Sequence, residues 1–231
     1  MPTNAEAPTL DGAGKIPIYI AKPDRDAKAA ILVIPEIFGV NSGICRKCDD
    51  WAALGYLAAA PDIFWRFAPG EEHDPDVEPE FNRALENMGK YDADQGVRDL
   101  AAAVDYLRAQ GADKVGAVGF CLGGRMAYMM ATRTDVDASV GYYGVMIDQM
   151  LDEAKAIANP LMLHIPTADH FVDAEAQAAM HAGLDEHDKV TLHDYDGLDH
   201  GFAAESGSRR NEEGAQLADQ RTRDFFSTHL A

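Results

Sequence analysis

Three residues suited to nucleophilic catalysis, Cys121, Asp169 and His200, occur in that order along the chain. Cys121 has Gly119 two residues before it and Gly123 two residues after it, in the pattern G-x-C-x-G. This pattern is typical of a sharp turn from a strand into a helix, where larger side chains at the glycine positions would clash. The turn exposes its central residue at a helix N-terminus, where backbone N–H groups and the helix dipole favour a thiolate. The sequence therefore predicts that Cys121 is a nucleophile rather than a buried structural cysteine.

His200 and Asp169 occupy the positions that a base and its supporting acid need. Each follows a predicted strand, and the carboxyl ends of parallel strands meet at one edge of a sheet. The order nucleophile, acid, histidine is that of α/β-hydrolases. We expect His200 to take the thiol proton and pass it to the leaving group, and Asp169 to fix the imidazole tautomer. Asp196 and Asp199 are alternatives for the acid, although Asp199 adjoins the histidine and is badly placed to reach the far edge of its ring.

Two backbone amides are the expected donors of an oxyanion hole. The N–H of Leu122 directly follows the nucleophile. The second donor should come from the loop after the strand at 29–34, where we choose Ile37. Donors at these two places would stabilise the negative charge that develops on a carbonyl oxygen under attack.

Strands alternate with helices over most of the chain, which indicates how these residues are positioned. Such alternation predicts an α/β fold, specifically an α/β-hydrolase fold with a mostly parallel sheet and helices on both faces. Residues 1–231 contain no repeat or linker and are expected to form a single domain. Strands are expected at 16–20, 29–34, 56–60, 114–119, 138–142, 161–165 and 190–195, and helices at 42–54, 80–89, 93–110, 126–132, 173–186 and 212–230.

The composition excludes several classes of partner. With 20 basic and 39 acidic residues, the chain has a formal net charge of −19, which repels the phosphates of nucleic acids and of anionic membranes. The N-terminus lacks the pattern of a signal peptide, and no run approaches the roughly 18 apolar residues of a membrane span. We therefore expect a cytoplasmic protein that acts on a small molecule and has no nucleic-acid or membrane partner. A monomer is expected, with an oligomer left open.

The other two cysteines, Cys45 and Cys48, have the spacing of a redox pair or of half a zinc site. The chain offers no second ligand pair, and both cysteines fall within a predicted helix. An odd total of three cysteines without a secretory signal also argues against a disulfide framework. We interpret this pair as packing residues, and we expect no metal and no cofactor.

Several short stretches, spread in order over nearly the whole chain, carry a resemblance to one family. They are EIFGVN at 36–41, GY at 55–56 with APDI at 60–63, GFCLGG at 119–124, GYYGV at 141–145, DHFV at 169–172 and HGF at 200–202. Together they resemble the dienelactone hydrolase family, the carboxymethylenebutenolidases, which use cysteine where most α/β-hydrolases use serine. The resemblance implies hydrolysis of an enol-lactone or related ester through a thioester-like acyl enzyme.

The resemblance also implies a role for Glu36. In this family a glutamate at the matching place interacts with the resting thiol, and substrate binding helps to hand the thiol to the histidine. A nearby carboxylate raises the pKa of a thiol, while a helix N-terminus lowers it. A thiol that is neutral at rest and ionised only when substrate displaces Glu36 satisfies both effects, and it would protect Cys121 from oxidation.

The sequence departs from this family at the arginines that bind the substrate. Dienelactone hydrolases bind a substrate carboxylate with two arginines, one a few residues after the catalytic histidine and one before the long helix. This chain has Ala203 and Ala204 at the first place and Phe81 at the second. Loss of bidentate guanidinium contacts weakens carboxylate binding, so we expect an altered preference for a neutral or hydrophobic ester or lactone.

Candidates for substrate contact are therefore less specific than the catalytic residues. Arg83 lies two residues from Phe81, and Arg209 and Arg210 lie further downstream. Aromatic and apolar residues near strand ends are candidate pocket walls, namely Phe38, Trp65, Met88, Tyr142 and Phe171.

Two other interpretations of Cys121 remain open. A thiol amidase or peptidase also uses a cysteine elbow, but such enzymes pair the histidine as His-x-Glu, whereas His200 is followed by Gly201 and Phe202. A non-catalytic or redox-sensing thiol protein on a hydrolase fold would have a cysteine that reacts with oxidant and turns over no ester.

Overall fold

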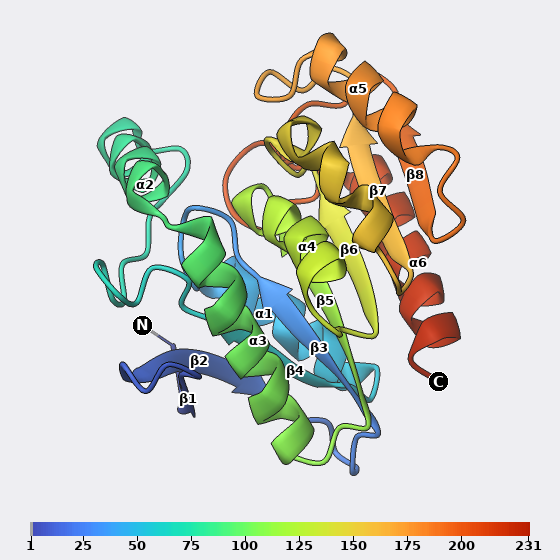
Figure 1. Ribbon diagram of the computed structural model, residues 1–231. Coiled ribbons are helices and arrows are strands. Elements are labelled where there is room, and N and C mark those ends of the chain that lie inside the picture. The colour runs from blue at the N-terminus through green and yellow to red at the C-terminus, as the bar shows by residue number, and fades with distance from the viewer. Residues whose placement is uncertain (1) are drawn as a thin grey trace.

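An eight-stranded sheet forms the centre of the computed structural model, which describes residues 2–231 (Figure 1). Its strand order is β1-β2-β4-β3-β5-β6-β7-β8. β2 pairs antiparallel with β1 and β4, and all other neighbours are parallel. The strands are β1 (Ala5–Pro8), β2 (Lys15–Ala21), β3 (Ala29–Ile34), β4 (Leu57–Pro61), β5 (Lys114–Phe120), β6 (Ala138–Tyr142), β7 (Leu161–Pro166) and β8 (Val190–Tyr195).

Helices cover both faces of the sheet. α3 packs on α4, α4 on the 3-10 helix η1, and η1 on α5, so these four share one face. On the other face α1 meets α6, where the rings of Trp51 and Phe226 lie 5.5 Å apart between centroids (Figure 1). The helices are α1 (Ser42–Ala53), α2 (Glu78–Lys90), α3 (Ala93–Ala109), α4 (Leu122–Arg133), η1 (Ile147–Ala156), α5 (Ala174–Leu184) and α6 (Glu212–His229).

Local sequence explains where these elements form. The central strands are apolar throughout because helices cover both of their faces, and every residue of β3 and β6 is buried. Four helices begin after an Asn or Asp whose side chain accepts hydrogen bonds from N–H groups of the first turn. These caps are Asn41 for α1, Asp92 for α3, Asp173 for α5 and Asn211 for α6.

The turn from β5 into α4 is the tightest part of the fold. Cys121 stands between the two elements with φ 56° and ψ −116°, in a region that few non-glycine residues adopt. A Cβ on Gly119 would collide with the carbonyl of Gly123, and a Cβ on Gly123 would collide with the carbonyl of Ile34 in β3. Both glycines are therefore required for α4 to start directly against the ends of β3 and β5.

The structure confirms the predicted mostly parallel α/β sheet, and it adds two elements that the sequence analysis did not predict. β1 is a short edge strand with only one residue buried, so its sequence has little apolar signal. η1 follows β6 and contains a kink at Met150, which breaks the helical periodicity. Among residues 2–231, no helix is both long and apolar enough to cross a membrane.

α2 stands apart from the layers that cover the sheet (Figure 1). Its polar side is held by Glu71 in the preceding loop, which accepts hydrogen bonds from Arg83 at 3.0 Å and from Asn87 at 2.7 Å. On its apolar side, the ring of Phe81 lies 5.9 Å from that of Phe38, which follows β3. α2 thus extends over the carboxyl edge of the sheet, where the candidate catalytic residues lie.

Candidate active site

Four predicted residues lie at the carboxyl ends of four different parallel strands. Glu36 follows β3, Cys121 follows β5, Asp169 follows β7 and His200 follows β8. Each of the four is at most 8% exposed. The right-handed crossovers of the fold bring these strand ends to one edge of the sheet, as expected for a ligand site in an α/β protein.

Asp169 is the carboxylate that contacts His200. One oxygen of Asp169 lies 2.8 Å from Nδ1 of His200, and the other accepts the N–H groups of Phe171 at 2.8 Å and Val172 at 3.1 Å. The two loop amides fix the carboxylate, and the carboxylate fixes the tautomer and orientation of the imidazole. Nδ1 then carries the hydrogen, which leaves Nε2 of His200 to exchange a proton with another group.

Asp199 and Asp196 have other partners. Asp199 accepts hydrogen bonds from the backbone N–H groups of His170 at 3.1 Å and His200 at 2.6 Å, and it contacts Nδ1 of His170 at 2.7 Å. Asp196 accepts a hydrogen bond from the hydroxyl of Thr167 at 3.3 Å. The geometry therefore places Asp169, rather than either alternative, behind the imidazole.

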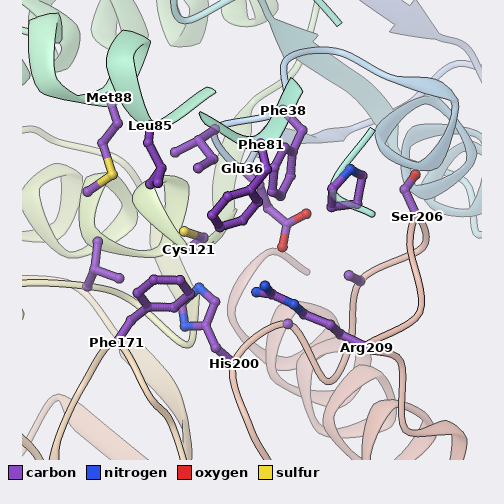
Figure 2. A pocket seen from close by; sticks show the side chains of 15 residues that line it. Glu36, Phe38, Phe81, Leu85, Met88, Cys121, Phe171, His200, Ser206 and Arg209 are labelled. Atoms are coloured by element: carbon purple, nitrogen blue, oxygen red, sulfur yellow. The ribbon is translucent and has the colours of Figure 1, made fainter. Parts of the chain in front are cut away.

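The free edge of His200 faces Cys121. Nε2 of His200 is buried and has no hydrogen-bond partner within residues 2–231; this edge of the ring lies toward Cys121, whose charge influences it (Figure 2). Burial lowers the pKa of His200, but the charge of a Cys121 thiolate and the hydrogen bond to Asp169 outweigh burial and raise the pKa to about 10. His200 therefore takes up and holds a proton readily at this position.

The two expected oxyanion donors belong to residues close to Cys121 in the sequence or in the cavity. Leu122 is the first residue of α4, so its N–H has no carbonyl one helical turn earlier within that helix. Ile37 directly follows Glu36 and lines the same cavity as Cys121. The backbone N–H of Cys121 itself is used, since it donates to the carbonyl of Tyr142 at 3.1 Å.

Glu36 lines the cavity, and its carboxyl points away from the thiol (Figure 2). Burial raises the pKa of its carboxyl, while His200, Lys47, the hydroxyl of Tyr143 and Arg209 act in the opposite direction. Among residues 2–231, no hydrogen bond joins Glu36 to Cys121. The structure thus places Glu36 in the same cavity as Cys121, but not in direct hydrogen-bond contact with it.

A largely apolar cavity opens above these residues. Its volume is about 140 Å³, so it suits a small ligand. Its walls come from the loop after β3, from α2 and from the loops that hold Phe171 and Arg209 (Figure 2). Its lining residues are Glu36, Ile37, Phe38, Pro75, Phe81, Leu85, Met88, Cys121, Val145, Phe171, His200, Gly201, Ala204, Ser206 and Arg209.

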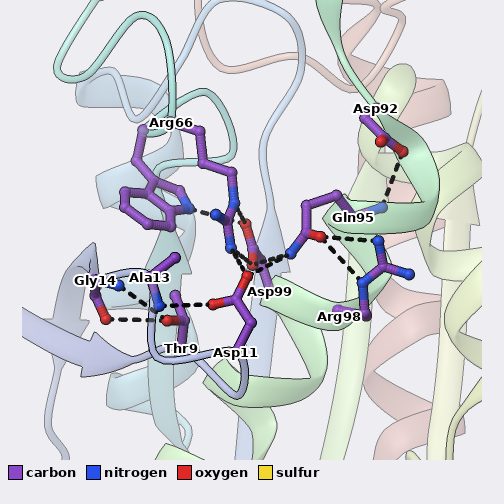
Figure 3. A network of polar contacts seen from close by, with 10 residues as sticks. Thr9, Asp11, Ala13, Gly14, Arg66, Asp92, Gln95, Arg98 and Asp99 are labelled. Atoms are coloured by element: carbon purple, nitrogen blue, oxygen red, sulfur yellow. Dashed lines mark hydrogen bonds and ion pairs between the residues drawn. The ribbon is translucent and has the colours of Figure 1, made fainter.

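Phe38, Met88 and Phe171 line this cavity, whereas three other predicted contact residues do not. Arg83 points its guanidinium at Glu71 with a separation of 3.0 Å. The indole N–H of Trp65 donates to Asp99 at 2.9 Å, in the polar cluster around Arg66 and Asp99 (Figure 3). Both side chains therefore bind acidic residues outside the cavity.

Tyr142 is the third of these residues, and the sequence analysis chose it over its neighbour. The hydroxyl of Tyr142 contacts Thr222 at 2.6 Å and donates to Asp219 at 3.0 Å, on the α6 side of the sheet. Tyr143 instead lies against the ring of His200, 4.9 Å between centroids, and interacts with Glu36. Tyr143 lies one residue beyond β6 with φ 38°, so the alternation of side chains along a strand does not indicate where it points.

Arg209 enters the cavity from the loop before α6. Its guanidinium lies over the rings of Phe81 and Phe171, at 5.5 and 5.8 Å from their centroids, and points between Glu36 and His200 (Figure 2). Within residues 2–231 it has no hydrogen bond or ion pair. The sequence could not assign it, because eight residues separate it from His200 and only the tertiary structure directs it inward.

The remaining clusters of ligand-type residues have structural explanations. Cys45 and Cys48 are buried and free, and burial raises the pKa of Cys45 to about 11 and that of Cys48 as well. Thiols that resist ionisation are poor metal ligands. Asp169, His170 and Asp199 approach one another closely, but their oxygens already accept the hydrogen bonds described above.

Comparisons with known proteins show what the chain as a whole is similar to. The model of the dienelactone hydrolase family matches residues 16–230. A relative from Azospirillum brasilense is 41% identical over 94% of this chain and 95% of its own length. Carboxymethylenebutenolidase 1 of Cupriavidus pinatubonensis is 33% identical over 95% of this chain and 94% of its own. A candidate dienelactone hydrolase structure from Klebsiella pneumoniae has a TM-score of 0.84 at 26% identity, over 96% of this chain and 97% of that one.

The pKa of His200 predicts how stability depends on pH. Its pKa is about 10 in the folded protein and 6.5 ordinarily, so its stabilising contribution is complete below pH 6.5 and is lost as pH rises to about 10. We expect the free energy of unfolding, measured in urea, to fall over this pH range in wild type. The fall should exceed that in His200→Gln by on the order of a few kcal/mol. Cys121→Ser should give an intermediate slope because a hydroxyl does not ionise. Parallel curves for wild type and His200→Gln would contradict the assignment.

Proposed function

Because the chain belongs to the dienelactone hydrolase family, we propose that this hydrolase cleaves an enol-lactone or related carboxylic ester with Cys121 as its nucleophile. The observation that carries the proposal is the contact of Asp169 with His200, whose ring lines the same apolar-walled cavity as Cys121. A small ester or lactone fits such a cavity better than a peptide chain, and the acid on a separate strand end differs from the His-x-Glu pairing of thiol amidases.

The reaction proceeds in two steps. The thiol proton of Cys121 passes to Nε2 of His200 while the sulfur attacks the substrate carbonyl, and the N–H groups of Ile37 and Leu122 bind the resulting oxyanion. His200 returns the proton to the departing oxygen, which in a lactone stays attached to the opened chain. Water then gives its proton to His200 and attacks the thioester, and Cys121 leaves as a thiol. Asp169 stabilises the imidazolium in both steps.

Glu36 regulates the thiol in this scheme. Its carboxyl is buried, which raises its pKa and disfavours its charged form. A charged Glu36 opposes the thiolate, and the hydroxyl of Tyr143 and the cation Arg209 draw the carboxylate away from the sulfur. A substrate that competes for these partners changes the charge near Cys121, so binding and activation of the nucleophile are coupled.

Arg209 changes the expected substrate. The absence of the family arginines at Phe81 and Ala203 led us to expect a neutral ester, but Arg209 supplies a guanidinium to the same cavity from another place in the sequence. A cation in an apolar cavity, without an ion pair of its own, attracts an anionic group of a ligand. We therefore favour an ester or lactone that carries a carboxylate.

Removal of the nucleophile tests the proposed reaction directly. Cys121→Ala should lower kcat/KM for dienelactone by about three orders of magnitude or more, and Asp169→Asn by a comparable or smaller factor. The substrates to assay are p-nitrophenyl acetate, a neutral lactone and dienelactone, with circular dichroism to show that the variants fold. Wild-type protein that forms a sulfenic acid at Cys121 with peroxide but hydrolyses none of these substrates would instead support a redox-sensing thiol.

The reactivity of the thiol tests the role of Glu36. In Glu36→Gln, a neutral amide of similar size replaces the carboxyl, so the thiolate should form at lower pH because the opposing charge is gone. We expect the pH profile of iodoacetamide alkylation at Cys121, measured by mass spectrometry, to shift downward by roughly one unit. Glu72→Gln, a change at a nearby loop acid, serves as the control. Identical profiles for wild type and Glu36→Gln would exclude the regulation.

The preference for an anionic substrate depends on Arg209. Arg209→Met should raise KM for dienelactone by roughly tenfold or more with little change in kcat, because the arginine contributes to binding in ground and transition states alike. Hydrolysis of neutral p-nitrophenyl acetate should be nearly unchanged. Arg83→Gln is the matched control, since that arginine pairs with Glu71 outside the cavity. The assignment would be refuted if Arg209→Met lowered kcat/KM equally for both substrates. It would also be refuted if Arg83→Gln raised KM for dienelactone alone.

A further inference from the structure

The loop that carries Arg209 has no regular secondary structure between Ala204 and Asn211, so its shape depends on side-chain contacts. Arg209 itself contributes only ring contacts with Phe81 and Phe171. A long guanidinium side chain held by rings alone keeps much of its rotational freedom. Some other part of the loop must fix the backbone from which Arg209 extends.

Glu205 is the residue through which this loop is joined to the rest of the fold. Its carboxylate lies 2.6 Å from a guanidinium nitrogen of Arg210 and 3.6 Å from Nζ of Lys47 in α1. Its backbone carbonyl accepts a hydrogen bond from Arg46 in α1 at 2.6 Å. Three cations, two of them on a rigid helix, therefore converge on one loop residue.

Lys47 makes this junction unusual because it is itself almost buried. Its side chain is 9% exposed, and its ammonium lies 4.5 Å from the ring centroid of Phe120, the residue before Cys121. A buried ammonium is costly unless a carboxylate accompanies it. Asp50 and Glu36 also experience the charge of Lys47, but Glu205 is the acid that forms an ion pair with it.

The other contacts of the loop are neutral or involve weaker acceptors. The hydroxyl of Ser206 lies 3.4 Å from the side-chain oxygen of Asn41, and that of Ser208 lies 2.9 Å from Asp76. Arg210 also pairs with Glu212 at 2.8 Å, but Glu212 is 64% exposed at the start of α6. Glu205 is the residue that joins the loop to α1 through charged groups, and Lys47 of α1 also contacts Phe120 at the end of β5.

From these contacts we infer that Glu205 is a positioning residue that holds the loop so that the guanidinium of Arg209 stays in the cavity, where it selects anionic esters and lactones. The inference rests on the proposed function. Glu205 does not line the cavity, so it acts on the substrate only through Arg209. Through Arg209 it therefore acts on the binding of a substrate carboxylate, which is the step that its replacement should weaken most.

The test compares anionic and neutral substrates in Glu205→Gln. We expect KM for dienelactone to rise about tenfold, while kcat and the hydrolysis of p-nitrophenyl acetate change less than about twofold. Glu212→Gln is the matched control, since it removes the other acid of Arg210 without touching Lys47. Glu205→Asp should restore part of the affinity because it keeps the charge on a shorter side chain. Equal losses for both substrates would overturn the inference.

A double-substitution cycle separates positioning from a general effect on folding. In the Arg209→Met background, Glu205→Gln should produce no further rise in KM for dienelactone, since both changes remove the same interaction. Additive effects would overturn the inference. Failure of the proposed function is distinct, because wild-type protein would then show no cysteine-dependent turnover. If Glu205→Gln does not fold, Arg210→Gln weakens the same junction and should give the same KM split.

Discussion

The close approach of three backbone segments at the turn after β5 is the constraint on which the site depends. Gly119 and Gly123 have no side chains, so α4 begins against the carbonyl of Ile34 at the end of β3. That contact sets the distance between the nucleophile on one strand and the oxyanion loop on the next. It also leaves Cys121 in a backbone conformation that is maintained only because the surrounding core is rigid.

Electrostatics of the site follow from this geometry. Four ionisable residues, Glu36, Cys121, Asp169 and His200, lie together with little access to water. Isolated buried charges would be unfavourable, so their charges must be distributed among partners. Asp169 is satisfied by loop amides and the imidazole, while Glu36 is influenced by His200, Lys47, Tyr143 and Arg209. The site is thus a coupled group in which a change at one member alters the protonation of the others.

Much of this arrangement could be predicted from the sequence because its signals are local. The glycine pattern around Cys121 specifies a turn, and the alternation of strands and helices brings residues after successive strands to one edge. The bounds of β3 and β6 agree with those expected, since their apolar runs end at clear breaks, and the bounds of the more polar β8 agree as well. The family resemblance was confirmed over residues 16–230.

Other features depend on tertiary contacts that leave no local pattern. Nothing in the sequence distinguishes Arg209, which enters the cavity, from Arg83, which pairs with Glu71 outside it. The choice between Tyr142 and Tyr143 depends on which face of β6 each side chain meets as the strand ends. β1 pairs at the sheet edge with few apolar residues, so its backbone hydrogen bonds rather than its side chains define it.

The separation of α2 from the layered core has a consequence for how this scaffold can diversify. Phe81, Leu85 and Met88 form one wall of the cavity, yet they belong to a helix that contributes no group to bond breaking. Substitutions on that face can reshape the space around a ligand without disturbing the strand ends. The residues that break bonds and those that shape the cavity therefore lie in different parts of the molecule. Substitutions in one surface helix can change which esters fit the cavity.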